Sequence, residues 1–115
     1  SQLKLVQVLQ GRVLDVIVDL RKESDTFGKH EKIYLNSNDR KILWVPEGCA
    51  HGFLSLENNS VFSYKCNKNY NKNSEITINW NDPDLNINWE IEKPLLSEKD
   101  KKGISFYEYL KLTEK

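Results

Sequence analysis

The sequence has no excess of either charge and contains little sulfur. Its 115 residues include 17 Lys and Arg, 17 Asp and Glu, two cysteines and no methionine. A balanced charge creates no field that would draw the chain to nucleic acid or to an anionic membrane, so neither is expected as a partner. Two cysteines are too few for a disulfide scaffold, and they indicate a reduced, cytoplasmic setting.

Long apolar runs are also absent. Hydrophobic residues make up 38% of the chain, which is below the usual share for a globular domain. No run approaches the roughly 20 apolar residues of a membrane-spanning helix. The length suits one domain with a modest core of its own. We therefore expect residues 1–115 to form a single domain without a transmembrane segment.

Turn residues separate short segments that are β-branched or that alternate apolar and polar side chains, which is typical of β-strands. We predict strands at residues 3–9, 13–20, 30–36, 41–45, 51–56, 61–66, 75–80 and 85–89. Ser105 is the expected N-cap of a short helix that ends at Leu112. Short strands with frequent turns and one late helix predict an all-β fold, an antiparallel β-sandwich or barrel.

The first two strands are predicted to form a hairpin that closes at Gln10-Gly11. This hairpin places Lys4 and Asp15 on one sheet face, among valines and an isoleucine. A buried charge costs several kcal/mol unless it is paired or used. The face is therefore either a site that employs both charges or a surface exposed to solvent.

A second hairpin is predicted to join residues 51–56 to residues 61–66 through a four-residue turn. Phe53 then lies opposite Tyr64, and His51 becomes a diagonal neighbour of Tyr64 on the same face. An imidazole beside a phenol suits proton transfer, because both groups can carry a proton to or from a reacting atom. The alternative is a hydrogen-bonded core histidine beside a packing tyrosine.

A series of longer blocks follows in a fixed order. They are Lys4-Leu5-Val6, Gly11-Arg12-Val13, Asp15-Val16-Ile17-Val18-Asp19-Leu20-Arg21, Thr26-Phe27-Gly28-Lys29, Trp44-Val45-Pro46-Glu47-Gly48-Cys49-Ala50-His51-Gly52-Phe53, Tyr64-Lys65-Cys66 with Tyr70, Trp80-Asn81-Asp82-Pro83, and Leu96-Ser97-Glu98-Lys99-Asp100. Together they resemble the sugar-nucleotide 3,5-epimerases, the dTDP-4-dehydrorhamnose 3,5-epimerase family. The likeness covers nearly all of the chain.

The resemblance implies a cupin-type jelly roll that forms a homodimer, with its site inside the barrel. The implied substrate is a nucleotide-diphosphate 4-keto-6-deoxy sugar of deoxysugar (rhamnose-type) biosynthesis. Its ketone acidifies the hydrogens on C3 and C5, so a base, an enolate and reprotonation on the opposite face are enough. No metal or other cofactor is implied. A metal-dependent cupin oxygenase would need two or three histidines on one ion, whereas the chain holds only His30 and His51.

The resemblance also assigns roles to six residues. Tyr64 matches the proton donor, and Lys4 and His51 match residues beside the keto oxygen, where charge develops in the enolate. Asp15 is similar to the acidic residue that supports this corner. Tyr70 matches a tyrosine that contacts the nucleotide diphosphate. Asp100 matches the carboxylate that orients the catalytic histidine.

The chain departs from the family pattern at its start. The family's base is a histidine a few residues before the position of Lys4, and this sequence begins at Ser1. The abrupt start and the missing methionine favour a fragment that lacks the family's N-terminal strands. The alternative is a shortened, non-catalytic cupin-like module for sugar-nucleotide binding or dimerisation. Epimerisation at C3, at C5 or at both, and the base of the nucleotide, stay open.

Overall fold

The computed structural model describes residues 3–57, 59–66, 77–91, 95–96 and 98–112. The chain divides into two compact units, residues 1–70 and residues 71–115. The first unit holds the strands β1 (Lys4–Gln10), β2 (Arg12–Asp19), β3 (His30–Asn36), β4 (Leu43–Val45), β5 (Cys49–Ser55) and β6 (Val61–Cys66), and the second holds the helices α1 (Glu98–Lys101) and α2 (Phe106–Leu112). Whether the two units make one domain stays a prediction.

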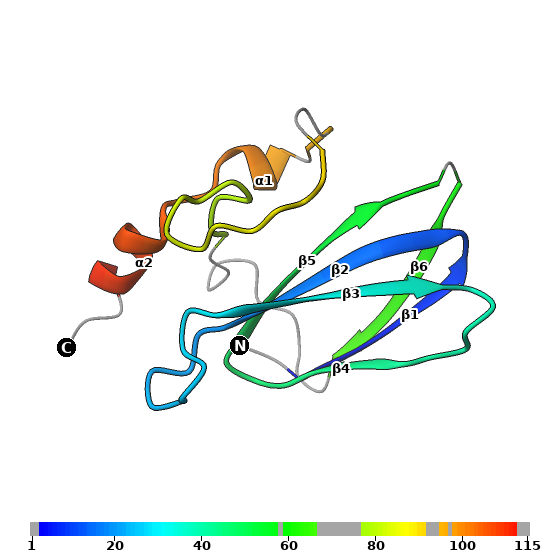
Figure 1. Ribbon diagram of the computed structural model, residues 1–115, viewed down its shortest axis with the longest axis horizontal. Helices are drawn as coiled ribbons and strands as arrows, with labels where there is room; N and C mark the ends of the chain where they lie inside the picture. Colours follow the sequence, from blue (N-terminus) through cyan, green and yellow to red (C-terminus); the bar gives the residue numbers. More distant parts are fainter. Residues whose placement is uncertain (1–2, 58, 67–76, 92–94, 97, 113–115) are drawn as a thin grey trace. The chain divides into compact units, whose positions relative to one another are not determined.

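The six strands form two three-stranded antiparallel sheets (Figure 1). The first sheet has the order β4-β1-β6 and the second the order β3-β2-β5. Their inner faces meet in an apolar core of five buried residues, Val6, Val8, Val13, Leu35 and Val45. The all-β prediction is confirmed, as a jelly-roll sandwich whose first two strands, like its last two, belong to different sheets.

Both predicted hairpins are wrong in their pairing. β1 pairs with β6 and places Val6 opposite Tyr64, whereas β2 pairs with β5 and places Asp15 opposite Phe53. Alternation along a strand predicts which residues share a face, but it does not predict the partner strand. A hairpin within one sheet would have left the valine-rich faces of β1 and β2 side by side. In the observed fold the two sheets pack face to face, and this packing buries the valine-rich faces of both strands.

The chain crosses between the sheets at a corner formed by Gly11 and Ser60. Gly11 has a φ of 84°, in the left-handed region, and a Cβ added there would collide with the Ser60 hydroxyl. Ser60 Oγ donates to the carbonyl of Arg12 over 3.3 Å. The β1–β2 and β5–β6 connections therefore touch at this point, where only glycine fits.

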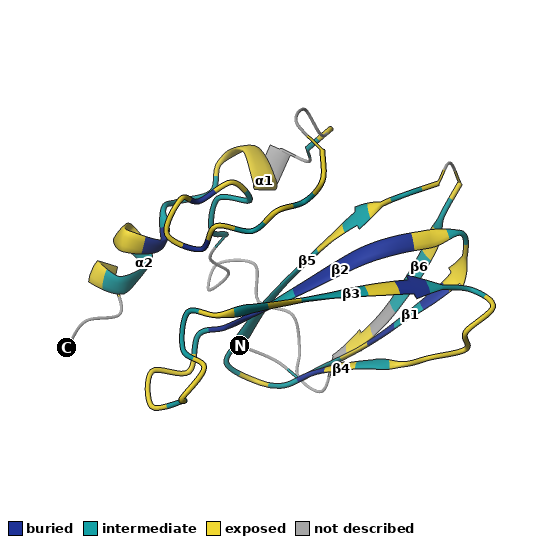
Figure 2. Ribbon diagram, in the orientation of Figure 1, coloured by how far each residue is buried: buried dark blue, intermediate teal, exposed yellow. Residues whose placement is uncertain are grey.

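β2 is the middle strand of the second sheet and is buried along most of its length (Figure 2). Val13 and Asp15 lie on its inner face, and Leu14 and Val16 on the other face are buried as well. A central strand that is buried on both faces has a nearly continuous apolar sequence. Asp15 is the fully buried charged residue in the middle of this run, and Asp19, which is also buried, ends the strand.

Asp19 closes the loop between β2 and β3. Its carboxylate accepts hydrogen bonds from the Arg21 guanidinium (Nε 3.0 Å, Nη2 3.1 Å), from the Arg21 backbone N–H (2.9 Å) and from the hydroxyls of Ser24 (2.6 Å) and Thr26. Arg21 in particular, with the two hydroxyls, holds the pKa of the Asp19 carboxyl well below its usual range. Hydrogen bonds to this one carboxylate thus join Arg21, Ser24 and Thr26 in a single network, the Asp19 network.

We expect Asp19→Asn to lower the free energy of unfolding near pH 7 by about 1–2 kcal/mol, since several charge-assisted hydrogen bonds are weakened at a partly solvated site. A depressed folded-state pKa gives stability that is present above the unfolded pKa, about 4, and that is lost as the pH falls below it. The difference in free energy of unfolding between wild type and Asp19→Asn should therefore become smaller in acid. Denaturant midpoints near pH 7 and near pH 3 check this.

The matched control is Asp25→Asn, in the same loop, where the side chain is exposed. It should change stability by less than about 0.5 kcal/mol at either pH. If Asp19→Asn lowers the free energy of unfolding by the same amount near pH 3 as near pH 7, the charged carboxylate does not hold the Asp19 network together.

The second unit is built around Asp82. Its carboxylate accepts the backbone N–H groups of Asp84 (2.9 Å), Leu85 (3.1 Å) and Phe106 (2.7 Å), so it ties a turn to the start of α2. Ser105 caps α2 as predicted, because its hydroxyl accepts the N–H of Glu108 over 3.0 Å.

The predicted strand at residues 85–89 is wrong. Asn86 and Glu90 have positive φ values of 51° and 64°, which a strand does not tolerate, and Trp89 Nε1 donates back to the carbonyl of Trp80. Within the described part of residues 75–80 the only pairing is a bridge from Ile78 to Ile104. Among the described residues, no helix has the length and apolar character to cross a membrane.

Candidate active site

His51 and Asp15 form a buried pair on the inner face of the second sheet. Their strands are hydrogen-bonded neighbours, and His51 lies opposite Ile17, two residues along β2 from Asp15. The His51 Nε2 atom lies 2.8 Å from Asp15 Oδ1 and 2.9 Å from Oδ2. The His51 side chain is 8% exposed and that of Asp15 is 0% exposed. This pair is the most deeply buried ionisable contact that the structure describes in the first unit.

One ring nitrogen of His51 faces both carboxylate oxygens of Asp15. Nε2–H of a histidine can be directed well at only one of them, and Asp15 Oδ1 has no hydrogen-bond donor among the described residues. Burial raises the pKa of the Asp15 carboxyl, and the contact with His51 offsets part of that rise. When Nε2–H of His51 is directed at this carboxylate, Nδ1 is the ring atom that can accept or donate a proton elsewhere.

Three aromatic rings join the two sheets beside this pair. Phe62 of β6 stacks on Phe53 of β5, with ring centroids 4.2 Å apart and planes 20° apart. Phe62 also lies nearly parallel to the His51 ring, at 6.0 Å and 11°. Phe53 keeps half of its surface exposed. The sandwich therefore presents an accessible aromatic surface beside a buried imidazole.

Lys4 and Tyr64 belong to the first sheet. Lys4 lies opposite Val45 and Cys66, and Tyr64 lies opposite Val6, a core residue, in the strand register. Alternation therefore gives positions 4, 6 and 64 the same face of the first sheet, the one that meets the second sheet. Lys4 is half-buried, and the structure describes only the backbone of Tyr64.

The remaining two predicted residues belong to other parts of the chain. Tyr70 lies outside the described residues, and Asp100 is an exposed residue of α1 in the second unit. The roles given to Tyr70 and Asp100 stay predictions.

His51 and Tyr64 are not diagonal neighbours on one sheet, as the predicted hairpin required. They come from facing sheets, because β5 and β6 do not pair. The family resemblance put Asp15 at the same corner as His51, but the predicted hairpins did not give a contact between the two side chains. Only the β2–β5 pairing brings those two residues together, and nothing local in the sequence indicates that pairing.

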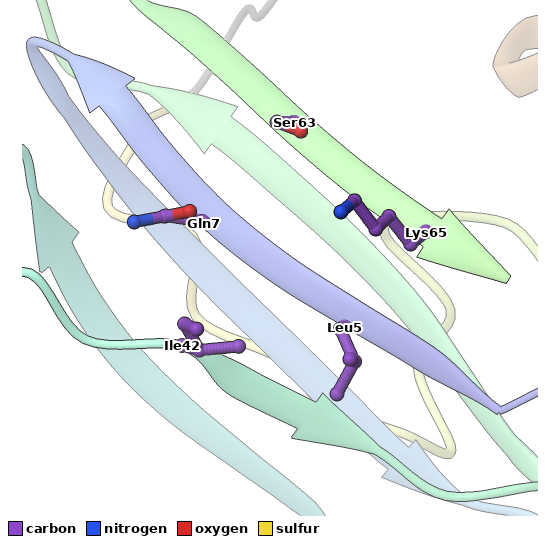
Figure 3. Close-up of a pocket in the computed structure, with 5 residues that line it drawn as sticks. All are labelled: Leu5, Gln7, Ile42, Ser63 and Lys65. Atoms are coloured by element: carbon purple, nitrogen blue, oxygen red, sulfur yellow. The ribbon is translucent and has the colours of Figure 1, made fainter.

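The outer face of the first sheet carries a shallow groove of about 100 Å³ (Figure 3). It is lined by Leu5, Gln7, Ile42, Ser63 and Lys65. These positions on β1 and β6 alternate with Lys4, Val6 and Phe62, so the groove faces away from the His51–Asp15 pair. Within the described ranges no three His, Cys, Asp or Glu side chains gather as metal ligands would.

Two three-stranded antiparallel sheets that pack around an apolar core, with a buried histidine–carboxylate contact on the inner face of one sheet, define the class of the protein as a jelly-roll sandwich. The family model for dTDP-4-dehydrorhamnose 3,5-epimerase matches residues 1–108. The chain belongs to the dTDP-4-dehydrorhamnose 3,5-epimerase family.

Relatives of known name agree with this assignment. The chain is 46% identical over 106 residues to dTDP-4-dehydrorhamnose 3,5-epimerase of Shigella flexneri, which covers 92% of the chain and 59% of that relative. A crystal structure of the Elizabethkingia anophelis enzyme matches with a TM-score of 0.89 at 48% identity, covering 93% of this chain and 60% of that one.

The epimerase of Legionella pneumophila, solved in complex with dTDP-4-keto-L-rhamnose, matches with a TM-score of 0.85 at 40% identity, covering 90% of this chain and 56% of that one. The chain thus spans about three-fifths of the length of the relatives that it matches.

Proposed function

We propose that the protein containing this chain epimerises a nucleotide-linked 4-keto-6-deoxy sugar, of the dTDP-4-dehydrorhamnose type, at C3, C5 or both. The observation that carries the proposal is the buried His51–Asp15 contact on the inner face of a family jelly roll. The bound dTDP-4-keto-L-rhamnose of the Legionella pneumophila relative supports the substrate class.

The chemistry needs a ketone, a base and an acid. A base removes a proton from C3 or C5, and the C–H electron pair moves into a C=C bond while the C4 oxygen takes the negative charge. An acid then delivers a proton to the opposite face of the same carbon, and the ketone is restored. Atoms and electrons balance without a redox step, so the substrate's own carbonyl serves as the electron sink.

The residues of this chain supply the enolate-stabilising and proton-donating side of that scheme. We assign proton delivery to Tyr64 and stabilisation of the C4 oxygen to Lys4 and His51, with Asp15 holding the imidazole. A preorganised cation or N–H donor at a developing oxyanion is worth more in a water-poor site than in bulk water. The resemblance gives proton abstraction to a histidine that is not among these 115 residues.

We also propose a homodimer, which the resemblance supports, and a cytoplasmic location, which the low number of cysteines supports. Exposed apolar side chains on the first sheet, including Leu9 and Trp44, are consistent with a surface that a second copy covers. Sedimentation of the full-length protein at two concentrations tests the dimer, and a monomer at both would end that part of the proposal.

The function is tested by incubating the full-length protein that contains these residues with dTDP-4-keto-6-deoxyglucose in D₂O. We expect deuterium to appear at C3, at C5 or at both, together with an epimerised product, as read by NMR of the sugar. Binding of the nucleotide sugar with no exchange at either carbon would instead favour a non-catalytic binding module. Absence of both binding and exchange would remove the assignment.

A further inference from the structure

The His51 ring is held in two ways, and the catalytic scheme uses only one of them. Asp15 fixes the Nε2 end of the ring at 2.8–2.9 Å. This contact restrains one ring atom, and because the outer side-chain torsion of histidine has broad minima, the plane of the ring is restrained less tightly than its Nε2 end. The ring of Phe62 lies nearly parallel to the imidazole, with 6.0 Å between centroids and 11° between planes. That is the offset, nearly parallel geometry that aromatic rings favour.

Phe62 comes from the opposite sheet. It lies on β6 opposite Val8, it packs against the apolar core, and its ring stacks at 4.2 Å on Phe53 of β5. The one side chain therefore touches both aromatic residues of β5 that flank the site. Because the stack crosses the core, its thickness sets how far β5 stands from β6 at this point.

Position 62 is also two residues before Tyr64 on the same strand. Strand alternation gives positions 62 and 64 the same face of the first sheet. A shift of Phe62 against His51 therefore moves the backbone of Tyr64 relative to the imidazole. Misplacement by about 1 Å in a reacting constellation can cost roughly 100-fold in rate.

We propose that Phe62 is a positioning residue: stacked on His51 across the core, it fixes the plane of the imidazole and the spacing between His51 and the strand that carries Tyr64. The catalytic part of this inference rests on the proposed function. The stacking part rests on the ring geometry alone, so the two parts can fail separately.

The test compares three variants of the full-length protein. Phe62→Leu keeps an apolar side chain but removes the flat ring, whereas Phe62→Tyr keeps the ring. Leu35→Ala is the control, because Leu35 belongs to the same core but lies on β3 and has no ring to stack on His51. Denaturation of each variant gives a temperature at which all of them are folded, and kcat and KM are measured there.

We expect Phe62→Leu to lower kcat at least 10-fold with a change in KM below about threefold, because orientation rather than binding is lost. Phe62→Tyr should stay within about threefold of wild type. Leu35→Ala should lose stability but keep its kcat. Equal kcat losses in Phe62→Leu and Leu35→Ala would mean that Phe62 only packs the core, and this outcome would overturn the inference.

A second readout does not need turnover. The His51 ring lies nearly parallel to the Phe62 ring, with centroids 6.0 Å apart, so its proton signals should carry a ring-current contribution from Phe62 that Phe62→Leu removes and Phe62→Tyr and Leu35→Ala retain. An unchanged His51 signal in Phe62→Leu would overturn the inference even in an active enzyme. If wild type is inert toward the keto-sugar, the proposed function fails, and the NMR comparison alone still decides whether Phe62 orients His51.

Discussion

Replacing Tyr64 with phenylalanine is expected to stop or misdirect reprotonation while deuterium exchange at the substrate continues. The change removes one hydroxyl and leaves the ring, so the enolate still forms but loses its donor on the face opposite the base. General acid catalysis of this kind contributes about 10²–10⁴-fold. The rate of product formation should decrease by a factor in that range, and the ratio of exchange to epimerisation should rise. Both are read from one NMR time course in D₂O.

The matched control is Tyr34→Phe, which makes the same chemical change at an exposed position on β3. It should leave both exchange and epimerisation at the wild-type rate. A Tyr64→Phe variant that epimerises normally would show that another group delivers the proton, and the role given to Tyr64 would be wrong.

Asp15→Asn is expected to lower kcat strongly while changing the free energy of unfolding only slightly. Asparagine has nearly the same shape but removes the negative charge that holds the His51 ring at 2.8–2.9 Å. Loss of oriented electrostatic stabilisation at a developing oxyanion costs about 10²–10³-fold in kcat. Stability near pH 7 should change by no more than about 1 kcal/mol, because the substitution also removes a buried carboxylate whose ionised form is costly.

The pH dependence of the Asp15 contribution has the opposite sign to that of Asp19. Burial raises the pKa of the Asp15 carboxyl above its unfolded value, so its favourable contribution is present below the unfolded pKa and is lost as the pH rises through the folded one. Wild type should therefore lose stability relative to Asp15→Asn on going from about pH 4 upward. Denaturant unfolding of both proteins across that range measures the difference. A constant difference would contradict the raised pKa.

Local sequence signals predicted the elements that local interactions determine. β3 (His30–Asn36) and β6 (Val61–Cys66) have the predicted bounds, and α2 starts at its predicted cap. Each of these elements is defined by alternation, by β-branched residues or by a capping serine within a few positions. The strand predicted at residues 85–89 failed because Asp82 and Trp89 bind backbone groups some distance away and bend the chain.

The candidate site was only partly predictable for the same reason. His51, Asp15 and Lys4 could be selected as polar residues on apolar faces, and the family likeness gave them roles. Their partners could not be deduced, because a strand's face follows from alternation whereas its neighbours follow from the packing of the whole sandwich. The contact of Asp15 with His51 spans 36 residues, and the ring contact of His51 with Phe62 joins different sheets.

The claim on which this account depends is that the substrate enters between the two sheets. The direct measurement is an NMR titration of the full-length protein with dTDP-glucose, which carries the nucleotide and a hexose but no ketone to react. We predict that the ring signals of His51 and the methyl signals of Ile17, its neighbour in the β2–β5 register, shift with ligand. The methyl signals of Leu5 and Ile42, in the groove on the outer face, should stay in place. Shifts confined to Leu5 and Ile42, with His51 unmoved, would contradict it.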